Sequence, residues 1–145
     1  LKESVGLVIY GGHSERMQGL FSLPVYALDY MKEERRAHLY NAVDLLVVSF
    51  SRENLPGTIM EAMACGLPCV GADAGGIPEV IDHLHNGYIA RYRSVEGFVE
   101  GIHWILSEPE YEILSREAVR KVETEYSEEC VARRYIDLYN KLFQK

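Results

Sequence analysis

The sequence has little positive charge, and it contains no long apolar run. Its 22 acidic side chains outnumber the 15 lysines and arginines, which gives a formal net charge of −7 at pH 7. A nucleic acid is therefore disfavoured as a partner, because a polyanion would be repelled at long range. A nucleotide is still a candidate ligand, because its binding needs only local hydrogen-bond donors. No apolar segment approaches the roughly 20 residues of a membrane span, and no signal peptide is visible, so we expect a cytoplasmic protein.

Cysteine is scarce as well. The three cysteines, Cys65, Cys69 and Cys130, are odd in number and have no metal-ligand spacing, so we expect reduced thiols rather than disulfides. His83 and His85 accompany Asp82 in a polar loop without further ligands nearby, and we expect no metal site there. The chain starts at Leu1 and is strand-like from Val5, which indicates a fragment of a longer protein.

Short apolar runs alternate with helical segments along the chain. The strands are expected at Val5–Tyr10, Pro24–Leu28, Asp44–Phe50, Pro68–Ala72 and Tyr88–Arg91. Helices are expected at about 32–42, 58–64 and 77–81, with three more after residue 94. This alternation predicts an α/β fold: a doubly wound, Rossmann-like parallel sheet of about five strands with helices on both faces.

The three final helices are predicted from their apolar spacing and their termini. The first has one apolar face, formed by Val95, Phe98, Val99, Ile102 and Leu106. Residues 107–110 read as a capping box that starts the second helix. Ser127 is expected to cap the third. Its apolar residues at helical spacing are Val131, Tyr135, Leu138, Tyr139 and Leu142, and the Tyr135/Tyr139 stripe is expected to be core rather than a cofactor site.

The most informative stretch runs from Ser49 to Glu79 and contains two glutamates, Glu53 and Glu61, across a loop-to-helix boundary. Residues 54–58 are typical of a loop and helix start, and Gly66 is expected to end the helix. A helix start can hold a phosphate, while carboxylates can accept hydrogen bonds from ribose and sugar hydroxyls. The spacing alone has a second explanation, in which the two glutamates only favour a helix start and bind no ligand.

Two longer motifs accompany this pair. Glu61 opens the run EAMACGLPCV, and residues 75–79 read GGIPE. Together with the Glu-x7-Glu spacing, they resemble the retaining glycosyltransferases of family 4, which have the GT-B fold. The resemblance extends from about Val5 to Phe143 and is densest between Ser49 and Gly87.

The resemblance implies that residues 1–145 are the donor-binding, C-terminal half of such an enzyme, with the N-terminal acceptor domain absent. The enzyme would transfer a sugar from a nucleotide diphosphate to a hydroxyl of an acceptor sugar or lipid-linked glycan, in polysaccharide or glycan biosynthesis. It would need no cofactor and no metal, and a peripheral position at the inner face of the membrane stays open.

The resemblance also assigns roles to residues. Glu61 would hold the ribose hydroxyls, and Glu53, the catalytic candidate, would contact the donor sugar. The segment after Glu53 would meet the sugar and the diphosphate; its binding residues are Asn54, Leu55, Gly57 and Thr58. The turn at Asp29 and Tyr30 would approach the nucleobase. Gly75 and Gly76 would allow a ligand or another backbone segment to come close, or they would only form a tight turn.

This chain departs from the family in two ways. Pro56 stands where the family commonly has glycine and lacks an N–H, so we expect the N–H groups of Gly57 and Thr58 and the Thr58 hydroxyl to contact the phosphate. The family's basic residues for the diphosphate lie before Val5. We therefore expect this chain alone to bind a nucleotide weakly and to be inactive. A non-catalytic sugar-nucleotide-binding module, or half of a GT-B epimerase, stays an alternative.

Overall fold

The computed structural model describes residues 5–12, 14–17, 19–49 and 54–143. The chain divides into two compact units, residues 1–39 and residues 40–145. In the first unit, β1 (Leu7–Tyr10) pairs in parallel with β2 (Val25–Leu28), and the short 3-10 helix η1 (Ser14–Met17) lies between them in sequence. Helix α1 (Glu33–Tyr40) follows β2 and leads into the second unit.

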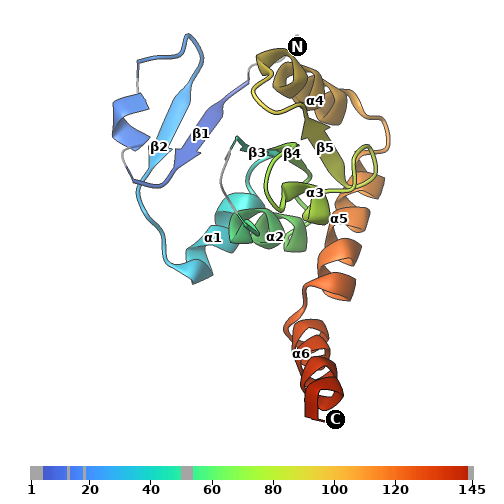
Figure 1. Ribbon diagram of the computed structural model, residues 1–145. Helices are drawn as coiled ribbons and strands as arrows, with labels where there is room; N and C mark the ends of the chain where they lie inside the picture. The colour runs from blue at the N-terminus through green and yellow to red at the C-terminus, as the bar shows by residue number, and fades with distance from the viewer. Residues whose placement is uncertain (1–4, 13, 18, 50–53, 144–145) are drawn as a thin grey trace. The chain divides into compact units, whose positions relative to one another are not determined.

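The second unit is built on a three-stranded parallel sheet. The order is β3-β4-β5, and the strands are β3 (Leu46–Val48), β4 (Cys69–Ala72) and β5 (Gly87–Ala90). The helices around it are α2 (Gly57–Ala64), α3 (Ile77–Val80), α4 (Val95–Ser107) and α5 (Tyr111–Glu125). Figure 1 shows α4 on one side of this sheet and α2 and α3 on the other. The predicted α/β class, with parallel strands and helices on both faces, is confirmed.

All five predicted strands are present, and they pair in parallel within each unit: β1 with β2 in the first, and β3, β4 and β5 in the second. Apolar periodicity identifies a strand because it reports which residues are buried. It carries no information about which strand donates hydrogen bonds to which, so the pairing could not be read from the sequence.

The core of the second unit lies on both faces of the sheet. On the α2 and α3 side, Ile59, Met63 and Ile77 have no exposed surface. On the α4 side, Val70 and Ile105 are equally buried. Burying an aliphatic side chain of this size stabilises the fold by about 1.5–3 kcal/mol. The buried core of the second unit therefore lies between the sheet and the helices on its two faces.

Gly66 ends α2 as predicted. Its φ of +75° is a left-handed conformation that favours glycine. The N–H of Gly66 donates to the Met63 carbonyl at 2.9 Å, and the N–H of Leu67 donates to the Ala62 carbonyl at 3.0 Å. These two bonds make a Schellman motif, which returns the chain sharply toward β4.

The predicted apolar face of α4 is only partly buried: Val95 and Val99 are 73% and 57% exposed, whereas the neighbouring Ile105 is fully buried. One detail of the final helices was predicted wrongly. The residues 107–110 do not form a capping box: α5 begins at Tyr111, and no side chain caps it. The reason is local, because the residue before Pro109 is held in an extended conformation (ψ 117°) that delays the helix start.

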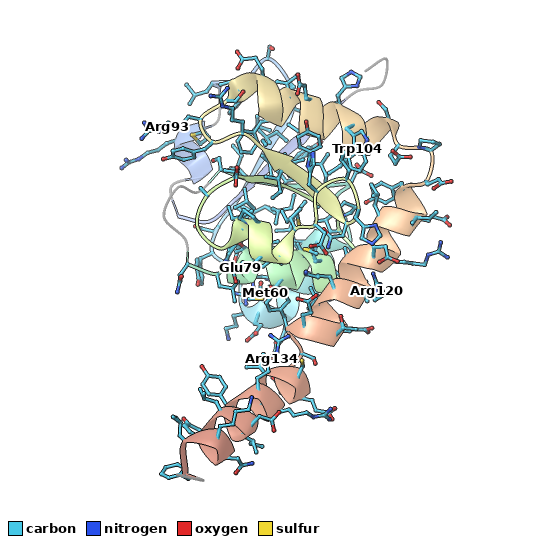
Figure 2. All side chains as sticks on the ribbon, turned by 45° about the vertical axis from the view of Figure 1, so that its right-hand side comes forward. Met60, Glu79, Arg93, Trp104, Arg120 and Arg134 are labelled. Carbon is cyan, nitrogen blue, oxygen red and sulfur yellow. The ribbon has the colours of Figure 1, made fainter. Side chains whose placement is uncertain are left out.

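Helix α6 (Glu128–Phe143) is capped by Ser127, whose hydroxyl accepts from the Cys130 N–H at 3.3 Å, as predicted. The prediction that the Tyr135/Tyr139 stripe is core is wrong, since no described residue of α6 is buried. Tyr135 is 56% exposed and Leu142 61%. In Figure 2 the side chains of this helix stand clear of the sheet. Within the described ranges, no helix is both long and apolar enough to cross a membrane.

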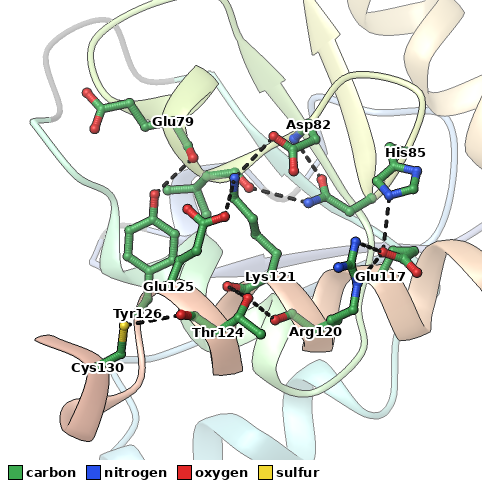
Figure 3. Close-up of polar contacts among 12 residues, drawn as sticks. Glu79, Asp82, His85, Glu117, Arg120, Lys121, Thr124, Glu125, Tyr126 and Cys130 are labelled. Atoms are coloured by element: carbon green, nitrogen blue, oxygen red, sulfur yellow. Dashed lines mark hydrogen bonds and ion pairs between the residues drawn. The ribbon is translucent and has the colours of Figure 1, made fainter.

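Polar contacts join α5 to the loop between α3 and β5 (Figure 3). The Lys121 ammonium lies 3.2 Å from the Asp82 carboxylate and 3.1 Å from Glu125. The Tyr126 hydroxyl donates to the Glu79 carbonyl at 2.9 Å. Since this loop follows the GGIPE segment, these contacts attach that segment to α5 and to Tyr126 at its end.

Candidate functional site

The loop before α2 and the start of α3 lie in direct contact. A Cβ on Gly76 would lie 1.8 Å from the carbonyl oxygen of Asn54 and 3.5 Å from the Cα of Leu55. The φ of Gly76 is −90°, which any residue adopts, so glycine is needed here for space and not for conformation. Of the explanations left open for Gly76, close approach of backbone is therefore the one that the structure supports.

Helix α2 begins at Gly57, one residue earlier than predicted, and presents an exposed start. Pro56 precedes it as N-cap with no side-chain cap, and its carbonyl accepts from the Ile59 N–H at 3.1 Å. Gly57 is exposed and Thr58 half-buried. The first N–H groups of a helix have no partner within it, so this end offers donors and a partial positive charge to an anion.

Glu61 lies one turn inside α2 and is half-buried. Its Oε2 accepts a hydrogen bond of 3.0 Å from the hydroxyl of Tyr40, which is only 4% exposed. The Glu61 charge also reaches Cys65: burial first, and then this carboxylate, raise the pKa of the Cys65 thiol. A buried tyrosine thus orients the Glu61 carboxylate.

The other predicted site residues are placed as follows. Asn54 and Leu55 are exposed on the loop before α2, Leu55 at 40%. Glu53 lies outside the described residues, so its distance from Glu61 is not part of this structure. The described part of the candidate site is therefore a half-buried carboxylate beside an exposed helix start.

A pocket of about 370 Å³ opens at the carboxyl ends of the three-stranded sheet. It is lined by Ser49 after β3, Ala72 at the end of β4, and residues 92–95 and Phe98 after β5. Its size is in the range of small-molecule sites. Ligands of open parallel sheets bind beyond the strand ends, so this pocket has the expected position.

A second pocket, of about 540 Å³, lies within the first unit. Asp29 and Tyr30 line it from the turn after β2, and Arg35 and His38 line it from α1. Tyr30 is 79% exposed, and its ring lies 6.3 Å from that of Tyr10. The turn expected to approach a nucleobase thus borders a pocket that has aromatic, acidic and basic groups.

The histidines next to Asp82 are used in local contacts. His83 Nδ1 accepts from the Ile89 N–H at 3.0 Å, and His85 Nε2 lies 3.1 Å from Glu117 Oε2. A hydrogen bond from Arg120 is the main cause that lowers the pKa of Glu117. In the part of the chain that the structure describes, no three His, Cys, Asp or Glu side chains gather as a metal site would require.

Sequence reasoning missed two features. Nothing in the helical pattern around Tyr40 indicated that its hydroxyl meets Glu61, 21 residues later. The loop after β5 was also passed over, although arginines at the end of a predicted strand were a usable signal. Arg91 ends the predicted strand, and Arg93, two residues later, lines the pocket of the three-stranded sheet.

Known proteins resemble this chain in sequence and in structure. The family described as glycosyl transferases group 1 matches residues 2–122. N-acetyl-alpha-D-glucosaminyl L-malate synthase of Bacillus anthracis is 30% identical over 109 residues, covering 74% of this chain and 29% of that protein. The amylovoran biosynthesis glycosyltransferase AmsK of Erwinia amylovora is 32% identical over 121 residues, covering 77% and 29%.

Among solved structures, that of HepE from Anabaena in complex with UDP-glucose has a TM-score of 0.76 with 20% identity. The match covers 92% of this chain and 40% of that one, and at this identity it shows the fold. The chain spans less than a third of the length of the two sequence relatives named above.

Proposed function

Because this chain belongs to the group 1 glycosyl transferases, we propose that it is the donor-binding half of a retaining enzyme with the GT-B fold. Residues 1–145 bind a nucleotide diphosphate sugar, and an N-terminal domain of the same protein binds the acceptor. The acceptor is a sugar or lipid-linked glycan of a surface polysaccharide pathway, and the enzyme works in the cytoplasm or at the inner face of the membrane. The names of AmsK and of the HepE complex support this class of reaction.

The observation that carries the proposal is the position of Glu61. Its carboxylate lies one turn inside α2, is held by the Tyr40 hydroxyl at 3.0 Å, and stands beside an exposed helix start. A carboxylate can accept hydrogen bonds from both hydroxyls of a ribose, and charge-assisted bonds of this kind are about twice as strong as neutral ones. Glu61 therefore binds the ribose of the donor in our proposal.

The helix start beside it takes the diphosphate. Gly57 N–H, Thr58 N–H and the Thr58 hydroxyl are the donors, and Asn54 and Leu55 contribute the loop backbone that faces the sugar. Glu53 contacts the donor sugar. The N–H groups of Gly57 and Thr58 are fixed by the helix before the substrate arrives, so they stabilise the leaving diphosphate as its charge develops. The proposal invokes neither a metal nor a cofactor.

The nucleobase is assigned to the pocket at Asp29 and Tyr30. A volume of about 540 Å³ accommodates a base, and the exposed Tyr30 ring offers it a stacking surface. Asp29 is an acceptor for the base's N–H groups.

Calorimetric titration of the whole protein with UDP, GDP and their sugars tests the proposal. Glu61→Ala should lower the affinity for the preferred nucleotide by at least about tenfold, because hydrogen bonds to charged groups contribute about 1.5–3 kcal/mol each. Glu100→Ala is the matched control. Glu100 also lies on a helix and accepts from a tyrosine, Tyr88, at 3.5 Å, but it is exposed on α4 away from α2.

An assay with labelled nucleotide sugars then separates transfer from the alternatives. A glycosylated acceptor with retained anomeric configuration, read by NMR, supports the proposal. An epimerised donor would assign the chain to an epimerase, and tight donor binding without any product would assign it to a binding module. Either result would refute the proposed transfer.

A further inference from the structure

Tyr40 is held in place by the core of the second unit. It is the last residue of α1, and its side chain is only 4% exposed. It belongs to the same buried cluster as Ile59, Ala62 and Met63 of α2. Side chains in a close-packed core stay in one rotamer on the time average, so the Tyr40 hydroxyl has a defined position before any ligand binds.

This hydroxyl restrains a carboxylate that would otherwise change rotamer. Glu61 is half-buried, and its Oε2 accepts from the Tyr40 hydroxyl at 3.0 Å. The Tyr88 hydroxyl, by contrast, reaches Glu100 at 3.5 Å in an exposed position, where water competes for the same groups. A glutamate loses considerable rotamer freedom when it is ordered, and a ligand that has to order it binds less tightly. Tyr40 removes that loss because it orders Glu61 in advance.

An oriented carboxylate discriminates better between sugars than a mobile one. An ionised carboxylate only accepts hydrogen bonds, and its two oxygens offer about four lone pairs. The Tyr40 hydroxyl uses one lone pair of Oε2. A vicinal diol donates twice, so it matches a carboxylate whose direction is set. When one hydroxyl of the diol is missing, a mobile carboxylate can turn to water, whereas an oriented one loses the bond without replacement.

We propose that Tyr40 is a positioning residue that sets the preference of this site for ribose over deoxyribose. Tyr40 acts through Glu61, because its own side chain is buried in the core. The inference rests on the proposed function, since it takes Glu61 as the residue that binds the ribose, and it adds the group that determines specificity there. The preferred ligand is a ribonucleoside diphosphate, and its 2′-deoxy form is the one that the site disfavours.

The test is Tyr40→Phe in the whole protein, titrated calorimetrically with UDP or GDP, whichever binds, and with the 2′-deoxy form of the same nucleotide. Phenylalanine fills the space of the tyrosine ring, so the variant stays folded, and thermal unfolding verifies this. The unchanged protein should bind the ribose form at least about tenfold more tightly than the 2′-deoxy form. In Tyr40→Phe this ratio should fall to about threefold or less.

Two controls separate positioning from a purely structural role. Tyr111→Phe removes a hydroxyl that donates to the Asp44 carbonyl at 2.8 Å, before the start of β3, so it should affect stability and keep the full ratio. In Glu61→Ala the two forms of the nucleotide should bind about equally. Adding Tyr40→Phe to Glu61→Ala should then change nothing further, because Tyr40 acts on the ligand only through Glu61.

Each outcome decides between the inference and the proposed function. If Glu61→Ala abolishes the ratio while Tyr40→Phe keeps it, the role of Tyr40 is overturned and the proposed function stands. If Tyr40→Phe weakens the binding of both forms equally, Tyr40 is structural only and the inference is likewise overturned. If the unchanged protein binds both forms equally, or binds neither UDP nor GDP, the assignment of Glu61 to the ribose fails and this inference fails with it.

Discussion

Helices α2 and α6 both carry apolar residues at helical spacing, yet they have opposite surroundings. In α2, Ile59, Ala62 and Met63 have no exposed surface, because the sheet lies on one side and α5 on the other. In α6 no described residue is buried, and Leu138 and Phe143 are 51% and 84% exposed. Apolar spacing therefore predicts a helix and its apolar face, but the elements packed against that face decide whether it is core.

The first prediction tests this difference directly. Met63→Ala should lower the free energy of unfolding by about 3 kcal/mol, because it leaves a cavity in a fully packed site. Leu138→Ala should change it by at most about 0.5 kcal/mol, since the side chain is already half in water. Urea unfolding of both variants gives the values. Equal losses would mean that α6 is packed as tightly as α2.

The second prediction concerns the contact of α2's entering loop with α3. Gly76→Ala should cost about 2 kcal/mol of stability, because the new methyl group meets the Asn54 carbonyl and the backbone must move. Gly57→Ala is the control: nothing lies within 4 Å of its Cβ position, so its stability should stay the same or rise slightly. If Gly76→Ala is as stable as the control, the loop before α2 and the start of α3 can move apart without loss of stability.

The third prediction concerns the role of the start of α2 in nucleotide binding. Thr58→Val should lower the affinity for a nucleoside diphosphate by about fivefold, the equivalent of one hydrogen bond, with little change in stability. Thr124→Val removes a hydroxyl that donates to the Arg120 carbonyl at 2.7 Å on α5, and it should leave the affinity unchanged. Calorimetry measures both, and an unaltered affinity of Thr58→Val would exclude the hydroxyl from the phosphate site.

The smallest effect is expected in cysteine reactivity. Cys65, at the end of α2, has a thiol pKa that burial and Glu61 raise, and the burial of Cys69 raises its thiol pKa further. Fewer thiolates form at pH 8, so iodoacetamide should modify Cys130 of α6 first, Cys65 more slowly and Cys69 last. Mass spectrometry of the native protein gives the order. Early modification of Cys69 would contradict the burial of β4.

Much of the candidate site could be predicted because its chemistry is local. Pro56 before the helix, Gly66 after it and Glu61 one turn inside are each set by residues within a few positions, and the structure has all three where expected. The Tyr40 hydroxyl on Glu61 and the Asn54 carbonyl against Gly76 join distant segments. No short-range pattern indicates such contacts, so they could not be predicted.

The sequence by itself determined which segments are strands and helices and where most of them end, because hydrogen bonding along the chain and residue conformation act over a few residues. Only the tertiary structure decided which strands pair within each unit, that α6 keeps its apolar face in water, and that Arg93 lines a pocket. Those outcomes depend on which surfaces meet, and the free energy of such meetings comes from area buried between segments far apart in the chain.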